Sequence, residues 1–434
     1  MRIFSRNLSP VEVEALAGKD LVTPLLTVTD RSEDQLTILR DYYLVRHDMK
    51  YQELATQLQQ QKDKIASLTR PASTVMVMQD VPQLRETVIL TRGQYDQPSE
   101  ITVTPKPLSI LAEPNGQSEA NRLGLAHWLF QNDHPLTSRV AVNRYWMMLF
   151  GTGLVATPED FGSQGEFPSH PDLLDWLAVD FRESGWDIKR MFKLMVMSST
   201  YRQDSSVTPA MVALDPDNRL LARGPRFRLQ AEFIRDNALA VSGLLIPDPG
   251  GPGGRVYQPP GLWAEVGLGG NPKFVQDHGR SLYRRSIYTY WKRSAPPPSM
   301  QIFDAPTREK CILQRSRTNT PLQALVLLND VQFVEASRNL AQQLLADAPR
   351  TDQQRLDELY SRVLSRPVRD EEVEVLLDVL NDSLERFKAD TKSATDLLAF
   401  GESKRDESLD AATHAAWTLL CSVVLNLDET LTRN

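Results

Sequence analysis

The chain has 434 residues, of which 41% are hydrophobic and 24% are charged, so it is long enough to bury a substantial core. Its formal net charge of −7 at pH 7 argues against general nucleic-acid binding, because neutralising phosphates requires a basic surface. No segment approaches the run of roughly eighteen apolar residues that a membrane-spanning helix needs.

A long polar helix is predicted over residues 32–68, where leucine, isoleucine and tyrosine recur at spacings of three and four. Its Gln-rich part, residues 52–61, invites a coiled-coil interpretation, but the apolar stripe is thin and short. The helix is therefore expected either to pack on its own domain or to mediate dimerisation. Pro71 ends it.

A small β element is predicted within residues 73–103, which are rich in β-branched side chains. We expect two short strands there, TVMVMQDV beginning at Thr74 and ETVILTRG beginning at Glu86. The residues from 97 to 116 contain four prolines and are expected to form an extended connector. These elements make up a predicted N-terminal extension, residues 1–116, ahead of a main domain, residues 117–434.

The main domain is predicted to be a large multi-helix domain, so the expected fold class is mainly α. Ser169 and Pro171 stand where a helix cap and first turn are favoured, Gly185 ends that helix, and Asp187 is expected to cap the next. We interpret this hairpin as a packing unit rather than a DNA-binding motif, because the chain is acidic. Further helices are expected over residues 119–131, 138–150, 229–243, 321–345, 352–364, 370–387 and 409–425.

A long insertion dense in glycine and proline, residues 247–299, interrupts the helical pattern. Only RSIYTYWKR, beginning at Arg285, has the composition of a strand. Loops of this length tend to be functional or mobile, so we expect the insertion to line any ligand site. Trp263 and Trp291 should hold its ends, and residues 250–254 should be mobile.

The clearest clue to a partner is a basic segment, residues 280–317, in which nine basic and two acidic residues give a local charge of +7. Interleaved aromatic side chains could stack on a ligand while arginines hold its carboxylate, sulfate or phosphate groups. The alternative is that the arginines pair internally and the aromatic residues form core. The candidate ligand-binding residues are Arg284, Arg285, Tyr288, Trp291, Arg293, Arg315 and Arg317.

Two carboxylates, Glu232 and Asp236, fall four residues apart on one predicted helix and are the candidates for acid–base catalysis. The same spacing is typical of ordinary ion pairs on a helix, which we favour. A second polar group lies in apolar sequence and is expected to form a buried network, with Asp160 or Glu166 as partners, or to hold an anion. Its members are Arg139, Asn143, Arg144, Asp160, Arg202, Arg228 and Arg235.

Neither a metal site nor a cofactor site is predicted. The six histidines show no metal-ligand spacing, and the chain contains no Cys-x-x-Cys-His haem-attachment motif. Cys311 and Cys421 are too far apart to define a zinc site and are expected to be buried free thiols.

Several long segments carry a resemblance to a known family. They are residues 134–204, RETVILTRGQYDQP from Arg85, NRLLARGPRFRLQAEFIRDNALAVSG from Asn218, YRRSIYTYWKRSAPPP from Tyr283, SRTNTPLQALVLLND from Ser316 and AAWTLLCSVVLNLDET from Ala415. The chain resembles the PSD-type C-terminal domain of unknown function of planctomycete cytochrome-c-associated proteins, in which a haem domain and a second domain usually come first. Because the haem-attachment motif is lacking here, the resemblance implies no electron-transfer role for these residues.

The resemblance also implies an extracytoplasmic location, in the periplasm or at the cell surface, because the relatives are exported. The residues that begin this chain show no apolar signal-peptide core, so a cytoplasmic location is expected if Met1 is the true start.

Three functions follow as hypotheses. The first is a non-catalytic binding module for an anionic ligand, such as a surface polysaccharide, or for a cytochrome-type partner domain. The second is a carbohydrate-active enzyme that uses two carboxyl groups, with Glu166, Glu232, Asp236 and Asp304 as candidates. The third is a purely structural module of a larger multidomain protein.

Overall fold

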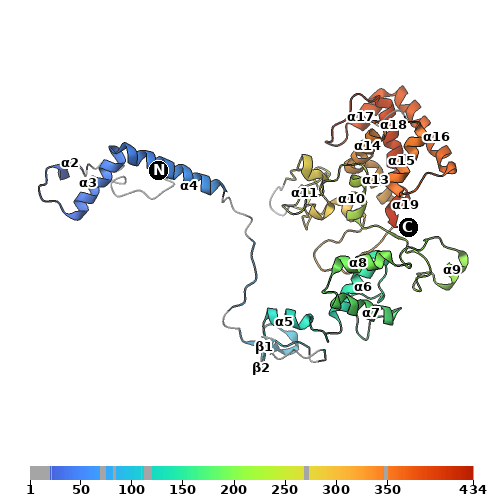
Figure 1. Cartoon of the computed structure of the whole chain (residues 1–434), viewed down its shortest axis with the longest axis horizontal. Coiled ribbons are helices and arrows are strands. Elements are labelled where there is room, and N and C mark those ends of the chain that lie inside the picture. The colour runs from blue at the N-terminus through green and yellow to red at the C-terminus, as the bar shows by residue number, and fades with distance from the viewer. Residues whose placement is uncertain are drawn as a thin grey trace. The chain divides into compact units, whose positions relative to one another are not determined.

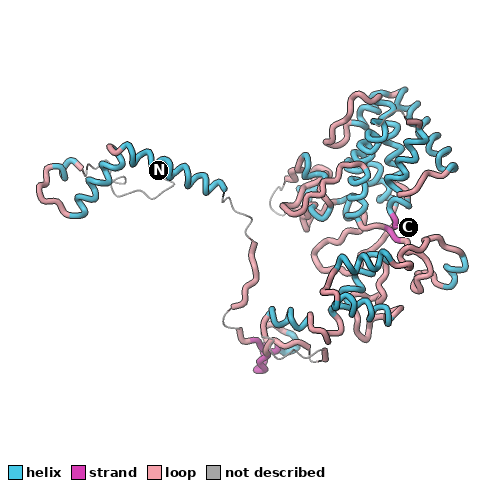
Figure 2. The backbone as a smooth tube through the Cα atoms, viewed as in Figure 1, coloured by secondary structure: helices cyan, strands magenta, loops and turns pink. Residues whose placement is uncertain are grey.

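The computed structural model describes residues 20, 22–68, 75–81, 85–108, 110–111, 120–267, 273–346 and 350–433. It is 53% helical, with 18 helices and two small two-stranded sheets in the described part, so the predicted mainly-α class is confirmed (Figures 1 and 2). The chain forms two compact units, residues 1–103 and residues 104–434.

The described part of the first unit begins with three helices: α2 (Thr23–Leu26), α3 (Glu33–Arg46) and α4 (Met49–Leu68). The prediction of one continuous helix over residues 32–68 is wrong, because the first helix ends at His47 and Asp48 caps a second one. The His47 amide closes α3 by donating to the Tyr43 carbonyl (2.7 Å), and the Asp48 carboxylate accepts from the Tyr51 amide (2.9 Å) as a new cap. No described side chain of α3 or α4 is buried.

A β-hairpin follows, in which β1 (Thr87–Leu90) pairs antiparallel with β2 (Pro98–Val103). The strand expected in ETVILTRG is confirmed, but the strand expected in TVMVMQDV is wrong. Residues 75–81 carry no regular structure and are exposed; Thr74 lies outside the described residues. The true partner comes from the expected connector, because a turn with positive φ at Arg92 (52°) and Gly93 (73°) folds the chain back locally.

In the second unit, α7 and α8 pack on α6 (Figure 1). Val142, Phe181 and Met191 are central to their apolar core. Asp187 caps α8 by accepting from the Arg190 amide (3.0 Å), as predicted, whereas His170 and not Ser169 occupies the cap of α7. The helices are α5 (Arg122–Leu129), α6 (Thr137–Phe150), α7 (Pro171–Glu183) and α8 (Ile188–Met197).

A second helical core is built around α18, which α14, α16 and α17 contact. Trp417, Leu420 and Cys421 of α18 are at most 1% exposed. The helix expected over residues 321–345 is in fact two helices, because Asp330 adopts extended backbone between them. These helices are α13 (Pro321–Asn329), α14 (Val331–Ala346), α15 (Asp352–Leu364), α16 (Asp370–Ala389), α17 (Thr391–Leu398), α18 (Ala411–Leu425) and α19 (Asp428–Leu431).

Shorter elements connect the two helical cores. They are α9 (Pro209–Leu214), β3 (Phe227–Arg228), α10 (Ala231–Val241), α11 (Leu262–Glu265), the 3-10 helices η2 (Gly279–Tyr283) and η3 (Ser286–Tyr288), α12 (Pro298–Ile302) and β4 (Thr432–Arg433). β3 pairs antiparallel with β4, so that Phe227 lies opposite Arg433. The Arg433 guanidinium stacks on Tyr201 (3.8 Å) and donates to the Leu149 carbonyl, which ties this sheet to the α6–α8 core.

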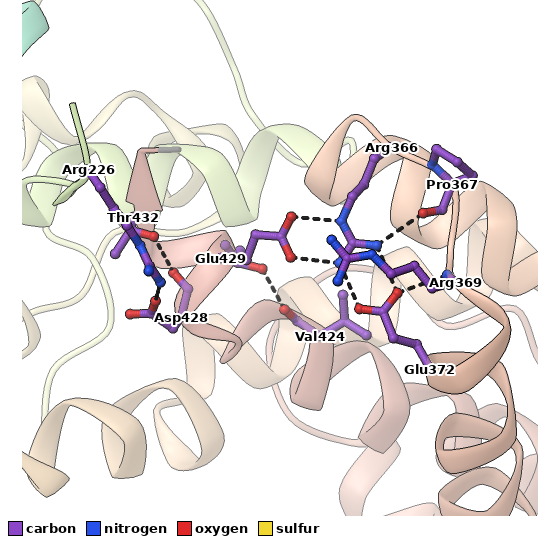
Figure 3. Close-up of polar contacts among 10 residues, drawn as sticks. Arg226, Arg366, Pro367, Arg369, Glu372, Val424, Asp428, Glu429 and Thr432 are labelled. Carbon is purple, nitrogen blue, oxygen red and sulfur yellow. Dashed lines mark hydrogen bonds and ion pairs between the residues drawn. The ribbon is translucent and has the colours of Figure 1, made fainter. Parts of the chain in front are cut away.

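An arginine fork holds α19 against the start of α16 (Figure 3). Arg366 donates to both carboxylate oxygens of Glu429 (2.7 Å each) and to both oxygens of Glu372 (2.7 and 2.8 Å). These charge-assisted bonds raise the pKa of Arg366 and lower the pKa values of both glutamates. The fork therefore fixes the segment that leads into β4.

The expected strand RSIYTYWKR is wrong. The segment forms the 3-10 turn η3 and isolated bridges instead, such as that between Gly254 and Thr289. The physical reason is that the Asp236 carboxylate accepts from both the amide (2.7 Å) and the hydroxyl (2.7 Å) of Ser286, so this amide is not available to a strand partner.

Arg235 of α10 is a deeply buried cation, whose side chain is 2% exposed. Its guanidinium donates to Gln332 Oε1 (2.6 Å), to the Leu282 carbonyl (2.5 Å), to the Arg284 carbonyl (2.8 Å) and to Ser286 Oγ (3.2 Å). Burial lowers the pKa of Arg235 to about 10, so the group is still charged at neutral pH. This one side chain joins α10, the η2–η3 segment and the start of α14.

A buried carboxylate, Glu335 of α14, is enclosed by residues 401–403. It is 0% exposed and accepts from the Tyr283 hydroxyl (2.8 Å) and the Ser403 amide (2.6 Å). Gly401 has a φ of 84°, and a Cβ added there would lie 2.2 Å from Cδ of Glu335. Only glycine therefore fits above this carboxylate.

Arg235→Met should lower the free energy of unfolding by about 3 kcal/mol, because it leaves buried carbonyls and Gln332 without their donor. Urea denaturation measures this change. Arg280→Met is the matched control: it removes an arginine that pairs with Asp248 on the surface, where ion pairs contribute little, and should behave like the parent. Equal stability of Arg235→Met and the parent would contradict the structural role of this charge.

Protonation of His414 should destabilise the fold. The side chain is 0% exposed, its Nε2 bonds the Arg338 carbonyl (3.0 Å), and burial lowers its pKa. The unfolded chain then binds more protons than the native one as pH falls below the ordinary histidine value of about 6.5. The free energy of unfolding should be highest above that pH and should fall between pH 7 and pH 5.

In urea titrations at pH 7, 6 and 5, the free energy of unfolding of His414→Gln should fall less with pH than that of the parent. Burial also lowers the pKa of His134, so part of the pH dependence should survive the substitution. His47→Gln, at an exposed position, is the matched control and should keep the parent's pH dependence. The assignment to His414 fails if its variant loses stability with pH as steeply as the parent.

Candidate functional site

A cavity of about 200 Å³ lies between α6, the residues that follow β3, the end of α12 and residues 312–317. Four arginines from three distant parts of the sequence line it, and we call it the arginine cavity. They are Arg144, Arg228, Arg315 and Arg317.

Arg228 has buried donors without partners in the described part of the chain. Its side chain is 12% exposed, and one terminal nitrogen donates to the Asp304 carboxylate. The other two guanidinium nitrogens, Nε and Nη1, are buried and have no hydrogen-bond partner among the described residues. Buried donors are normally paired, so this arrangement points to a missing acceptor.

The other three arginines differ in how many contacts their guanidinium groups make. Arg317 stacks on the Phe227 ring (4.5 Å), and burial, reinforced by the charge of Arg228, lowers its pKa. Arg315 donates to Glu232 (2.6 Å). Arg144 is exposed at the rim and forms no described side-chain bond.

Two carboxylates accompany the four arginines, which leaves an excess of two positive charges. One is Asp304, which lines the cavity and accepts from the amide (2.8 Å) and hydroxyl (2.9 Å) of Thr318. Burial, the largest influence, raises the pKa of Asp304, but the bonds from Thr318 and Arg228 together outweigh it, so the pKa is lowered. The other carboxylate is Glu232. The net positive charge makes the cavity suited to an anion.

The structure brings Arg315 and Arg317 of the basic segment together with Arg144 and Arg228, which the sequence assigns to a separate polar network. Sequence reasoning did not indicate Phe303, Gln314 or Ser316 as lining residues, because they lie in or beside irregular segments without periodicity. Asp304, a predicted candidate for glycoside cleavage, lies in the wall of this cavity instead.

The remaining members of the basic segment have other partners. Arg284 stacks on Tyr288 (4.2 Å) and donates to the carbonyls of Gly250 and Pro252 (2.7 Å), so it holds the expected mobile loop. Arg285 lies 3.8 Å from Asp236.

Two further candidates of the basic segment lie beside residues 307–309. Trp291 donates its indole N–H to the Thr307 carbonyl (3.1 Å) and stacks under Arg308 (4.3 Å), while Arg293 lies 3.7 Å from Glu309.

The residues expected to form a buried polar network around α6 have separate partners instead. Arg139 bonds Asp175 (2.7 Å), not Asp160 or Glu166. The reason is that Asp160 closes its own turn by accepting from the Gly162 amide (2.7 Å). Asn143 is fully buried; its side chain accepts from the Val155 amide (2.9 Å) and donates to the Val155 carbonyl (3.0 Å). Arg202 is exposed.

The two candidate catalytic carboxylates are both engaged. Glu232 binds Arg315, and Oδ1 of Asp236 binds Ser286. Asp236 lines a separate groove. Within the described residues, no group of three histidine, cysteine, aspartate or glutamate side chains is arranged to hold a metal ion.

The two thiols lie in opposite environments. Cys421 is buried, and burial raises its pKa, whereas Cys311 is exposed beside the cavity-lining Ile312. The expectation that both are buried is therefore wrong for Cys311, which lies in an irregular segment and not in a helix.

A maleimide reagent should therefore modify one thiol in the native protein and two in urea. Peptide mapping should place the native adduct on Cys311, and Cys311→Ser should abolish it. A native adduct on Cys421 would contradict the packing of α18.

The comparisons with known proteins give a family and no function. The family model PSD1, described as a protein of unknown function (DUF1553), matches residues 121–380, a range that contains the whole arginine cavity. No curated protein and no solved structure matches the chain. Among the described residues, no helix combines the length and the apolar character needed to cross a membrane.

Proposed function

We propose that the chain, which belongs to the PSD1 (DUF1553) family of proteins of unknown function, is a binding module for an anionic group. The arginine cavity is the proposed site. The ligand class is a carboxylate, sulfate or phosphate carried by a larger molecule, for which an acidic surface polysaccharide is the leading candidate.

The observation that carries this proposal is the pair of unpaired nitrogens of Arg228. Two buried donors without acceptors cost roughly 1–3 kcal/mol each, and an oxyanion in the cavity would satisfy them with charge-assisted bonds. Arg144 adds further donors. Arg317 is held in place by its stacking on Phe227 and by two long bonds to the Gly151 carbonyl (3.3 and 3.4 Å), and its remaining N–H groups add to the donor set.

The size of the cavity supports one charged group rather than a whole small molecule. Its volume of about 200 Å³ is below the roughly 300–1,000 Å³ of sites that enclose a drug-sized ligand. The rest of the ligand would lie outside, next to Arg144 at the rim. A side group of a polymer meets this description.

No specific observation favours a cytochrome-type partner, a carbohydrate-active enzyme or a purely structural module. A cytochrome-type partner would also present carboxylates, but nothing in the described residues distinguishes it. Cleavage of a carbohydrate by Glu232 and Asp236 would require freeing both carboxylates from Arg315 and Ser286.

Anion binding should be detectable through a fluorophore attached to Cys311. Titration with a sulfated glycan such as chondroitin sulfate and a carboxylated one such as polygalacturonate should change the fluorescence, and uncharged dextran should not. Arg228→Gln and Arg144→Gln should each weaken binding about tenfold by removing charged donors. Affinity should fall as salt rises.

Arg280→Gln is the matched control, because Arg280 is a surface arginine of the same basic segment outside the cavity. It should bind like the parent. A c-type cytochrome as a further titrant tests the partner hypothesis in the same assay. The proposal fails if no anionic glycan binds, or if both cavity variants bind like Arg280→Gln.

A further inference from the structure

A second cavity, of about 850 Å³, runs along the exposed side of α10 and is open to solvent. Its other walls are the end of α15, the α19–β4 segment and the side chain of Arg285. We call it the α10 groove. Its volume is in the range of sites that hold a small molecule or several units of a polymer.

Phe233 lies in this groove with half of its surface, 51%, exposed. The inward face of α10 is already filled by Ile234 and Ala238, which are at most 5% exposed, so Phe233 is not part of the core. An aromatic side chain left open in a concave site offers a flat apolar face to a ligand.

Polar groups with unused capacity stand beside this ring. Oδ1 of Asp236 accepts two bonds from Ser286. Among the described residues, the nearest cation to Oδ2 is Arg285 at 3.8 Å, which is too long for a hydrogen bond. The side-chain amide of Asn237 has no hydrogen-bond partner among the described residues. The groove therefore presents an acceptor, an amide that both donates and accepts, and the Arg285 donors next to one aromatic face.

We propose that the α10 groove is a binding site for an uncharged sugar ring. A sugar has an apolar C–H face that stacks on an aromatic ring, and its neighbouring hydroxyls both donate and accept. Phe233 carries the stacked face, while Asp236 Oδ2, Asn237 and Arg285 bind the hydroxyls at the ring edge. No chemical step is involved.

The composition of the groove favours a sugar over an apolar protein segment. A docked apolar side chain would bury Asp236, Asn237 and Arg285 without partners, which costs free energy at each group. A polyol pairs with all three. The site is separate from the arginine cavity, so its failure would leave the anion proposal standing.

Saturation-transfer NMR with maltotriose, cellotriose, xylotriose and mannotriose tests the site with defined neutral probes. At least one trisaccharide should receive signal from the native protein. Phe233→Ala and Asn237→Ala should each raise its Kd at least tenfold or abolish the signal. Both positions are on the solvent side of α10, so thermal unfolding should confirm that the variants remain folded.

Two controls make the result specific. Trp176→Ala removes a similarly exposed aromatic side chain from α7 and should bind like the parent. Arg144→Gln alters the arginine cavity and should also retain neutral-sugar binding. The proposal is overturned if no trisaccharide gives a signal, or if the signal of Phe233→Ala equals that of Trp176→Ala.

Discussion

The buried guanidinium of Arg235 is the interaction on which the arrangement of the second unit depends. It donates to the Leu282 and Arg284 carbonyls and to the Gln332 side chain. Because the group is buried away from water, these acceptors are what stabilise its charge. α10 therefore has one orientation relative to α14 and the η2–η3 segment. Its outer side borders the α10 groove, and the residues just before it line the arginine cavity.

Four arginines of this unit fall into two groups. Arg366, between Glu372 and Glu429 (Figure 3), has several partners. Arg433, on Tyr201, also has several, and the two arginines hold β4 where β3 can pair with it. Arg144 and Arg228 lack such partners, in whole or in part, although one is exposed and the other nearly buried. The first two arginines stabilise the fold through these contacts. The fold alone does not explain the unpaired donors of the second two.

The sequence predicted those elements whose signals are local. The helix over Asp352–Leu364 agrees with its predicted bounds because Thr351 and Gln354 form a capping box at its start. The break at Asp330 was missed because apolar residues continue on both sides of it. The partner of β1 was misassigned because β-branched composition does not identify which segment pairs.

High basic charge over residues 280–317 indicated Arg315 and Arg317 as candidate site residues, but the same run includes Arg284, whose donors bond to backbone carbonyls. The arginine cavity joins residues more than 80 positions apart, which no local pattern encodes.

The pairing of β3 with β4 also has a consequence for the order of folding. Phe227 lies opposite Arg433, 206 positions later, whereas the α14–α18 core and the α6–α8 core each form from much closer segments. Contacts of large sequence separation carry the greatest loop-closure cost and tend to form late. Arg228 reaches its position opposite Thr432 only when this sheet closes. We therefore expect both helical cores to be assembled while the arginine cavity is still open, so that binding competence is gained at the last folding step and is the first property lost on partial unfolding.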